Sequence, residues 1–137
     1  QKHVKEIPSI AVVGLNPHCG DGGIFGQEET ELILPAIKTA QQEGIQASGP
    51  YPADALFQRA ASEKYDAVIC MYHDQGMIPV KMNGMSVNIT MGLPILRTSV
   101  DHGTAYDIVG RNKASAENLK LALKTAGRLS QSTLSMQ

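Results

Sequence analysis

The chain has 137 residues, of which 42% are hydrophobic and 18% charged, so it can form a core and is not disordered in composition. Its 12 basic and 13 acidic residues give a net charge of -1, without the basic excess of a typical nucleic-acid-binding protein. No apolar run reaches the roughly 20 residues that span a bilayer, and the charged start lacks a signal-peptide core. We expect a one-domain cytoplasmic protein with no nucleic-acid or membrane partner.

Strands and helices alternate in the first half of the predicted structure. Residues 10–15 form a nearly continuous apolar run, which is typical of a strand buried on both faces. Helical spacing of apolar residues predicts a helix over residues 28–43, in which Pro35 either causes a kink or marks where the regular helix begins. A second helix over residues 53–64 leads into an apolar strand over residues 67–72. This alternation favours an α/β layered fold.

The second half is predicted to be more extended before it ends in a helix. Residues 86–91 alternate polar and apolar side chains, and residues 95–98 form a second short extended segment. Residues 100–112 are rich in polar residues and glycine, so we expect an ordered loop with a helical turn near Asp107. Ser115 can cap the last helix. The apolar stripe of that helix is expected to contain Ala116, Leu119, Ala122, Leu123, Ala126 and Leu129.

Two histidines directly follow predicted buried strands. His18 lies in LNPHCGDGG, and His73 lies in MYHDQG. Ligands collect at the carboxyl ends of strands in open α/β sheets, so neighbouring strands would bring both imidazoles into one crevice. Such a pair could bind a divalent metal, with Asp54 or Asp74 as an oxygen ligand or as a hydrogen-bond acceptor. Since zinc sites normally have at least three protein ligands, the alternative is that each histidine only caps its loop.

Other polar groups are candidates for binding anions or moving protons. The glycines of residues 20–26 could present amides to an anion, but they match neither the P-loop nor the GxGxxG motif, and a tight turn explains them as well. Three other residues could together bind a phosphate group, through an ammonium charge, a side-chain amide and a planar guanidinium group. They are Lys81, Asn88 and Arg97. The alternative is that they are ordinary charged and polar surface residues. Residues 102–107 form a polar turn that could carry a general base.

Four long motifs occur in a fixed order within residues 10–112, namely LNPHCGDGGIFGQEE, YPAD, MYHDQGMIPVK and VNITMGLPILRTSVDHGTAYDIVGR. In this order they resemble the PdxA family, the 4-hydroxythreonine-4-phosphate dehydrogenases of pyridoxine biosynthesis. Family members are much longer, so the resemblance implies that residues 1–137 are the C-terminal portion of a two-domain enzyme. It further implies a three-layer α/β/α fold like that of isocitrate and isopropylmalate dehydrogenases, and a homodimer whose active sites lie in interdomain clefts and are shared between subunits.

The resemblance also implies roles for the histidines and the acidic residues. His18 and His73 match metal ligands, and the third histidine of the family would lie outside this chain. The ion would be zinc, manganese, cobalt or magnesium. Asp54 and Asp74 match acidic positions of the active site, and Lys81 matches a position that could move a proton as well as bind phosphate.

Substrate and cofactor contacts are implied in the same way. Lys81, Asn88 and Arg97 match the positions that bind the phosphate of the substrate. DHGTAYDIVG is similar to the HGSAPDIAG loop of isocitrate and isopropylmalate dehydrogenases, which holds the adenosine end of the dinucleotide. The expected NAD contacts are therefore His102, Gly103, Thr104, Ala105 and Asp107.

The implied activity is NAD-dependent and metal-dependent oxidation of the secondary alcohol of a phosphorylated four-carbon hydroxy acid, followed by decarboxylation. The string HDQGMIPVK is closer to the HDQGHIPVK of a branch linked to 4-phospho-D-threonate than to the HDQGLPVLK of the vitamin B6 enzymes, which act on 4-phospho-hydroxythreonine. This favours the sugar-acid branch. The alternative is a non-catalytic metal- or phosphate-binding α/β module, or an inactive fragment.

Overall fold

The computed structural model describes residues 7–59 and 65–134. The chain divides into two compact units, Gln1–Pro79 and Val80–Gln137, where its length alone predicted one domain. No helix in the described part of the chain is both long and apolar enough to cross a membrane.

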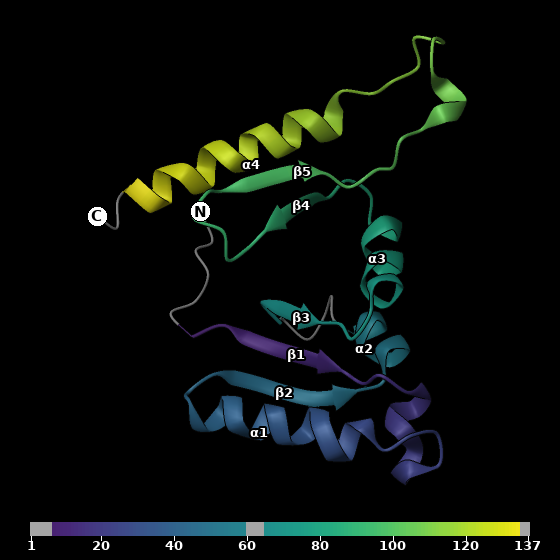
Figure 1. Ribbon diagram of the computed structural model, residues 1–137, viewed down its shortest axis with the longest axis vertical. Helices are drawn as coiled ribbons and strands as arrows, with labels where there is room; N and C mark the ends of the chain where they lie inside the picture. Colours follow the sequence, from purple (N-terminus) through teal and green to yellow (C-terminus); the bar gives the residue numbers. More distant parts are fainter. Residues whose placement is uncertain (1–6, 60–64, 135–137) are drawn as a thin grey trace. The chain divides into compact units, whose positions relative to one another are not determined.

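The first unit contains a three-stranded sheet in the order β2-β1-β3. The central strand β1, Ser9–Val13, pairs in parallel with β2, Gln46–Tyr51, and with β3, Ala67–Ile69 (Figure 1). Because all three strands run in one direction, their carboxyl ends lie at one edge of the sheet. This edge positions the candidate site.

One face of the sheet is covered by the helical segment between β1 and β2. That segment begins as a π-helical turn, Glu29–Ile33, and continues as α1, Leu34–Gln42. Pro35 stands in the first turn of α1, where a helix does not need its amide hydrogen, so Pro35 marks where the regular helix begins. Ile37 of α1 packs against Val12 of β1 in a buried cluster.

The opposite face of the sheet is covered by α2, Ala53–Arg59. Leu56 of α2 is fully buried and packs against Ala11 and Val13 of β1. Successive side chains of a strand point to opposite faces, so β1 is covered on both sides, as its apolar run predicted. The last part of the helix predicted over residues 53–64 lies outside the described residues.

Three parts of the first unit differ from the sequence prediction. The strand β2 was not predicted, and it forms although its end contains Gly49 and Pro50, because pairing with β1 outweighs this local turn signal. The strand β3 was predicted to be buried, but Ile69 is 48% exposed, since β3 is the last strand in the order β2-β1-β3. The helix α3, His73–Met82, was not predicted, and its interior Pro79 and Gly76 are residues that weaken a helix signal.

The second unit contains an antiparallel strand pair and a long helix. The strands are β4, Val87–Thr90, and β5, Arg97–Val100, close to the two predicted extended segments. The helix α4, Glu117–Leu134, packs on this pair, and the Thr98 hydroxyl donates a hydrogen bond to the Ala122 carbonyl at 3.1 Å. Between β5 and α4 the chain makes a short helical turn, Tyr106–Ile108, which confirms the turn expected near Asp107.

The start of α4 agrees with the prediction, but its apolar stripe agrees only in part. The Ser115 hydroxyl accepts a hydrogen bond from the Glu117 amide at 3.3 Å, which confirms its capping role. Ala122 is buried against β5, whereas Leu119 and Leu123 are 54% and 65% exposed. These two leucines were wrongly placed on the side of α4 that packs against the sheet. The sheet has only two short strands, so it covers a narrower face of α4 than the apolar stripe occupies.

Candidate functional site

Each strand of the parallel sheet is followed by a residue that the sequence singled out. His18 follows β1, Asp54 lies in the first turn after β2, and His73 begins the helix after β3. The chain passes from β1 to β2 on one side and then returns to β3 on the other, so the carboxyl ends of β1 and β3 flank a switch point. Ligands bind at such points because the loops there separate. The expectation that the strands carrying the two histidines are neighbours is confirmed.

A buried glutamine connects the two segments that carry the histidines. The Gln75 side-chain amide donates to the Gly14 carbonyl at 2.7 Å, and its oxygen accepts from the Met71 amide at 2.7 Å. Gly14 precedes the loop of His18, and Gln75 lies two residues after His73. The sequence analysis did not single out Gln75, although it lies in MYHDQG. Nothing in the local sequence indicates that a glutamine side chain will be buried.

His73 is arranged as metal-binding histidines commonly are. Its Nδ1 lies 2.8 Å from the Asp74 carboxylate, and the two side chains are 78% and 76% exposed. Because a carboxylate can only accept a hydrogen bond, Nδ1 carries the hydrogen in this contact and Nε2 is left to bind a ligand. Asp74 accepts this hydrogen bond, and its part in a metal site stays a prediction.

His18 lies in a left-handed stretch of backbone. Residues 18–22 all have positive φ, and the non-glycine members His18, Cys19 and Asp21 have φ of 53°, 54° and 44°. A non-glycine residue in this region costs roughly 1–2 kcal/mol, so the surrounding structure must stabilise the loop. His18 is exposed, and its ring lies 6.1 Å from the ring of Phe25.

Glu29 is the residue around which this loop is organised. One carboxylate oxygen accepts hydrogen bonds from the Leu15 and Asn16 amides, both at 2.7 Å, and the other accepts from Asn16 Nδ2 at 2.9 Å. Burial by itself would raise the pKa of Glu29, but the hydrogen bonds from the Asn16 side chain and from backbone amides outweigh it and lower the pKa. The carboxylate thus stays ionised, although the side chain is only 3% exposed. The adjacent Glu28 looks equivalent in the sequence, which is why Glu29 was missed.

Cys19 adjoins His18 and carries a protonated thiol. Burial and then the negative charge of Glu29 raise the pKa of its thiol, so it remains protonated at neutral pH. The negative charge of Asp54 raises the pKa of Cys19 further. Asp54 lies in the first turn of α2, so it follows β2 at the same carboxyl edge of the parallel sheet at which the loop of His18 follows β1.

The candidate metal ligands do not form a complete set in the described part of the chain. Over residues 7–59 and 65–134, no three side chains of histidine, cysteine, aspartate or glutamate come together in a way that could hold an ion. The chemistry of the donors still suits a divalent metal, because His73 has an oriented imidazole and His18 an exposed one. A site built on this edge would need a further ligand.

The second unit places two of the three phosphate candidates on one face. Asn88 of β4 and Arg97 of β5 share a face because Asn88 pairs with Ser99 and Thr90 pairs with Arg97. This face is opposite to the one through which Thr98 contacts α4. One guanidinium nitrogen of Arg97 donates to the Thr90 hydroxyl at 3.0 Å. A planar fork and an amide on one exposed face are suitable donors for a phosphate group.

The third phosphate candidate, Lys81, lies at the end of α3. Its ammonium group donates to the backbone carbonyl of Asp101 at 2.9 Å, just after β5. The Asp101 carboxylate accepts hydrogen bonds from the Ser86 hydroxyl and, at 2.9 Å, from the Asn118 amide of α4. The hydrogen bond from Ser86 is the main reason why the pKa of Asp101 is lowered. Asp101, which was not predicted, anchors the start of the loop before α4.

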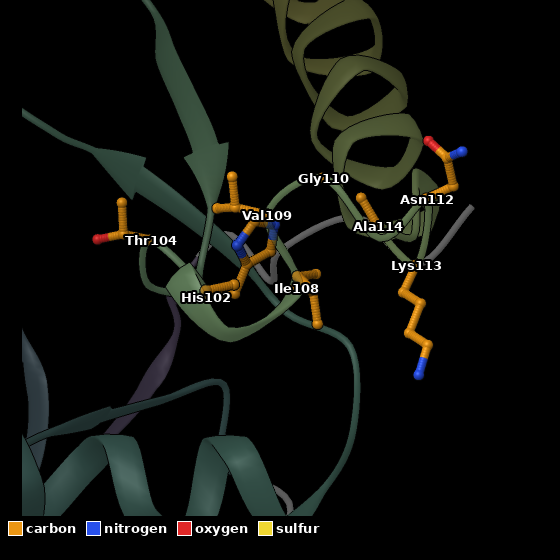
Figure 2. Close-up of a pocket in the computed structure, with 9 residues that line it drawn as sticks. His102, Thr104, Ile108, Val109, Gly110, Asn112, Lys113 and Ala114 are labelled. Carbon is orange, nitrogen blue, oxygen red and sulfur yellow. The ribbon is translucent and has the colours of Figure 1, made fainter.

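That loop lines an open pocket of about 340 Å³. Three of the five predicted NAD contacts line it, namely His102, Thr104 and Ala105. Its walls also include apolar side chains that the sequence analysis did not single out, among them Ile108 and Val109 (Figure 2). Such a mixture of apolar surface and a few polar groups is usual in small-molecule pockets.

The other two predicted NAD contacts do not line this pocket. Gly103 instead contributes its carbonyl oxygen, which lies 3.0 Å from Nδ1 of His102. Asp107 is exposed within the short helical turn. All five NAD contacts stay predictions.

Fold and site together define an α/β protein whose candidate ligand-binding side chains follow parallel strands. The family model described as "Pyridoxal phosphate biosynthetic protein PdxA" matches residues 1–126. The chain belongs to the PdxA family.

Individual relatives agree with this assignment. A 4-hydroxythreonine-4-phosphate dehydrogenase of Geobacter metallireducens is 55% identical over 130 residues, which are 93% of this chain and 38% of that protein. A Symbiobacterium thermophilum protein, provisionally named a D-threonate 4-phosphate dehydrogenase, is 53% identical over 88% of this chain and 37% of its own length.

A solved structure has the same fold. The crystal structure of 4-hydroxythreonine-4-phosphate dehydrogenase from Klebsiella pneumoniae has a TM-score of 0.77 and 45% identity, and the match covers 90% of this chain and 38% of that one. The chain thus spans a little more than a third of the length of the proteins it matches.

Proposed function

We propose that the full-length protein containing this chain is an NAD-dependent dehydrogenase that oxidises the secondary alcohol of a phosphorylated four-carbon hydroxy acid and then releases carbon dioxide. The observation that carries the proposal is the position of His18, Asp54 and His73 after the three parallel strands, with His73 oriented by Asp74. The names of the relatives support a dehydrogenase.

His18 and His73 would hold a divalent ion, zinc, manganese, cobalt or magnesium, together with a third histidine outside this chain. When bound, such an ion would lower the pKa of the substrate's hydroxyl and polarise the ketone into which oxidation converts that alcohol. Asp74 keeps the His73 ring in the tautomer that leaves Nε2 available. Asp54, in the first turn after β2, would accept a proton on this edge.

The second unit would supply the phosphate and cofactor contacts. Arg97 and Asn88 present donors on one exposed face, where they would bind the phosphate of the substrate and fix its orientation. Lys81 would add a positive charge and a proton donor once its contact with the carbonyl of Asp101 is exchanged for substrate. The pocket lined by His102 would hold the adenosine end of NAD, and the nicotinamide end of the cofactor would accept the hydride.

The remaining proposals concern the whole enzyme. The chain would be its C-terminal portion, within a cytoplasmic homodimer of two-domain, three-layer α/β/α subunits that share active sites. Relatives named for each substrate match this chain at 55% and 53% identity. We therefore propose both 4-phospho-D-threonate and 4-phospho-hydroxythreonine as substrates to test, with preference for the first.

The test is turnover by the full-length protein. NADH formation would be followed with each substrate and with zinc, manganese, cobalt or magnesium, before and after treatment with a chelator. We expect turnover with at least one substrate that is lost on chelation and restored by metal. Metal binding without turnover of either substrate would contradict the dehydrogenase and favour a non-catalytic metal-binding module.

A further inference from the structure

The strongest feature without an assigned role is the carboxylate of Glu29. Among residues 7–59 and 65–134, Glu29 and Gln75 are the buried polar side chains. Glu29 accepts hydrogen bonds with both oxygens, two from backbone amides at 2.7 Å and one from Asn16 Nδ2 at 2.9 Å. The carboxylate oxygens of Glu29 therefore face the segment that connects β1 to His18, and not the solvent.

The loop of His18 is folded closely around this carboxylate. A Cβ atom added at Gly14 would lie 2.9 Å from one carboxylate oxygen of Glu29, and one added at Gly20 would lie 2.9 Å from the other. His18 lies between these two glycines, in a left-handed conformation that its own side chain does not favour. The path of the loop therefore depends on contacts from outside, and Glu29 supplies them on both sides of His18.

We propose that Glu29 is a positioning residue that holds the loop of residues 14–20 so that His18 is presented for metal binding. This inference rests on the proposed metal site. Glu29 acts through the amides of Leu15 and Asn16, and nothing in its geometry requires it to touch the metal or the substrate. A carboxylate is needed because three N–H donors converge on it, whereas a glutamine would turn an NH₂ group towards some of them.

The test compares Glu29→Gln with Glu31→Gln in the full-length protein. Glu31 lies in the same helical turn and its substitution removes the same charge, but its side chain is exposed. Co²⁺ alone is the probe, because its visible absorption reports ligation by imidazole. We expect Glu29→Gln to raise the Kd for Co²⁺ by about 10- to 100-fold, as loss of a group that orients a ligand commonly does, and Glu31→Gln to change it less than about twofold.

A second measurement separates this inference from the proposed function. Amide hydrogen exchange at Leu15 and Asn16 reports the contacts of Glu29 whether or not metal binds. We expect exchange there to be more than about tenfold faster in Glu29→Gln, with the amides of β1 unchanged. If the unsubstituted protein binds no Co²⁺, the proposed metal site is contradicted, while exchange that stays slow in Glu29→Gln contradicts the role of Glu29.

A milder variant keeps the proposal testable if Glu29→Gln does not fold. Asn16→Ala removes the side-chain donor to Glu29 at 2.9 Å, and with it the hydrogen bond from the same nitrogen to Glu28 at 2.6 Å, but leaves both backbone amides on the carboxylate of Glu29. We expect it to weaken Co²⁺ binding about threefold to tenfold, less than the loss of the carboxylate itself. Unchanged Co²⁺ affinity in a folded Glu29→Gln protein, or in Asn16→Ala if the former does not fold, would overturn the proposal.

Discussion

The left-handed loop before α1 offers a matched pair of glycine substitutions, Gly20→Ala and Gly22→Ala. Both glycines have positive φ, +78° and +68°, so alanine is disfavoured at either position. They differ in their surroundings. A Cβ at Gly20 would lie 2.7 Å from the carbonyl oxygen of Gly26 and 2.9 Å from the carboxylate of Glu29, whereas a Cβ at Gly22 would meet nothing within 4 Å.

The magnitudes follow from these two terms. An alanine in the left-handed conformation destabilises the folded state by roughly 1–2 kcal/mol. Alanine also lowers the conformational entropy of the unfolded chain, and this offsets about 0.4–1 kcal/mol of that cost. Gly22→Ala should therefore lower the free energy of unfolding by about 1 kcal/mol. Gly20→Ala adds an overpacking cost of about 1–3 kcal/mol, because its nearest contact is a backbone oxygen that cannot rotate away. Its total should be about 2–4 kcal/mol.

The assay is urea unfolding of the two variants and the unsubstituted full-length protein, followed by circular dichroism. Gly20→Ala should also weaken Co²⁺ binding more than Gly22→Ala does, since its Cβ would displace the carboxylate of Glu29. Equal destabilisation by the two variants, or a larger effect of Gly22→Ala, would refute the inference that the loop is packed closely against Glu29.

Three further predictions concern the core of the first unit, the face of β4 and β5 that carries Asn88 and Arg97, and the stability of the protein at acidic pH. Leu56→Ala should lower the free energy of unfolding by about 2–5 kcal/mol, because the side chain is fully buried against β1; a loss below about 1 kcal/mol in urea unfolding would contradict this packing. Arg97→Ala should raise the KM for the phosphorylated substrate by at least about tenfold and that for NAD by less than about twofold, since we propose that the guanidinium group of Arg97 binds the phosphate; steady-state kinetics that show equal losses would remove this role. The pKa of Asp101 lies below its ordinary value of 3.8 in the folded protein, so its contribution to stability is complete above pH 3.8 and is lost as the pH falls through the lowered pKa. Asp101→Asn should flatten the loss of stability below pH 3.8, and an unchanged pH profile of urea midpoints would count against the contact with Ser86.

Local signals were sufficient for most elements of the fold. The apolar run of β1, the capping hydroxyl of Ser115 and the helical spacing before Gly44 all act within a few residues of chain. Hydrophobic periodicity and turn chemistry are short-range properties, so they can be read without knowledge of the partner surface. For the same reason His18 and His73 could be placed at strand ends before the sheet was known.

Tertiary contacts decided what local signals could not. The strand β2 exists because β1 pairs with it, and this pairing overrides a segment that contains Gly49 and Pro50. Leu119 appears equivalent to Ala122 by helical spacing, yet the strand pair of the second unit covers only the latter. Burial depends on the neighbouring element, which spacing within a helix does not specify.

The same distinction applies to the candidate site. The sequence determined which residue types follow the strands, and it thereby indicated imidazoles, carboxylates and a guanidinium suited to a metal and a phosphate. Only the tertiary structure decided that Glu29, and not the adjacent Glu28, is buried beneath the loop of His18 and accepts its backbone amides. The physical reason is that both glutamates have the same chemistry, and the direction of each side chain is set by how the helical segment packs on the sheet.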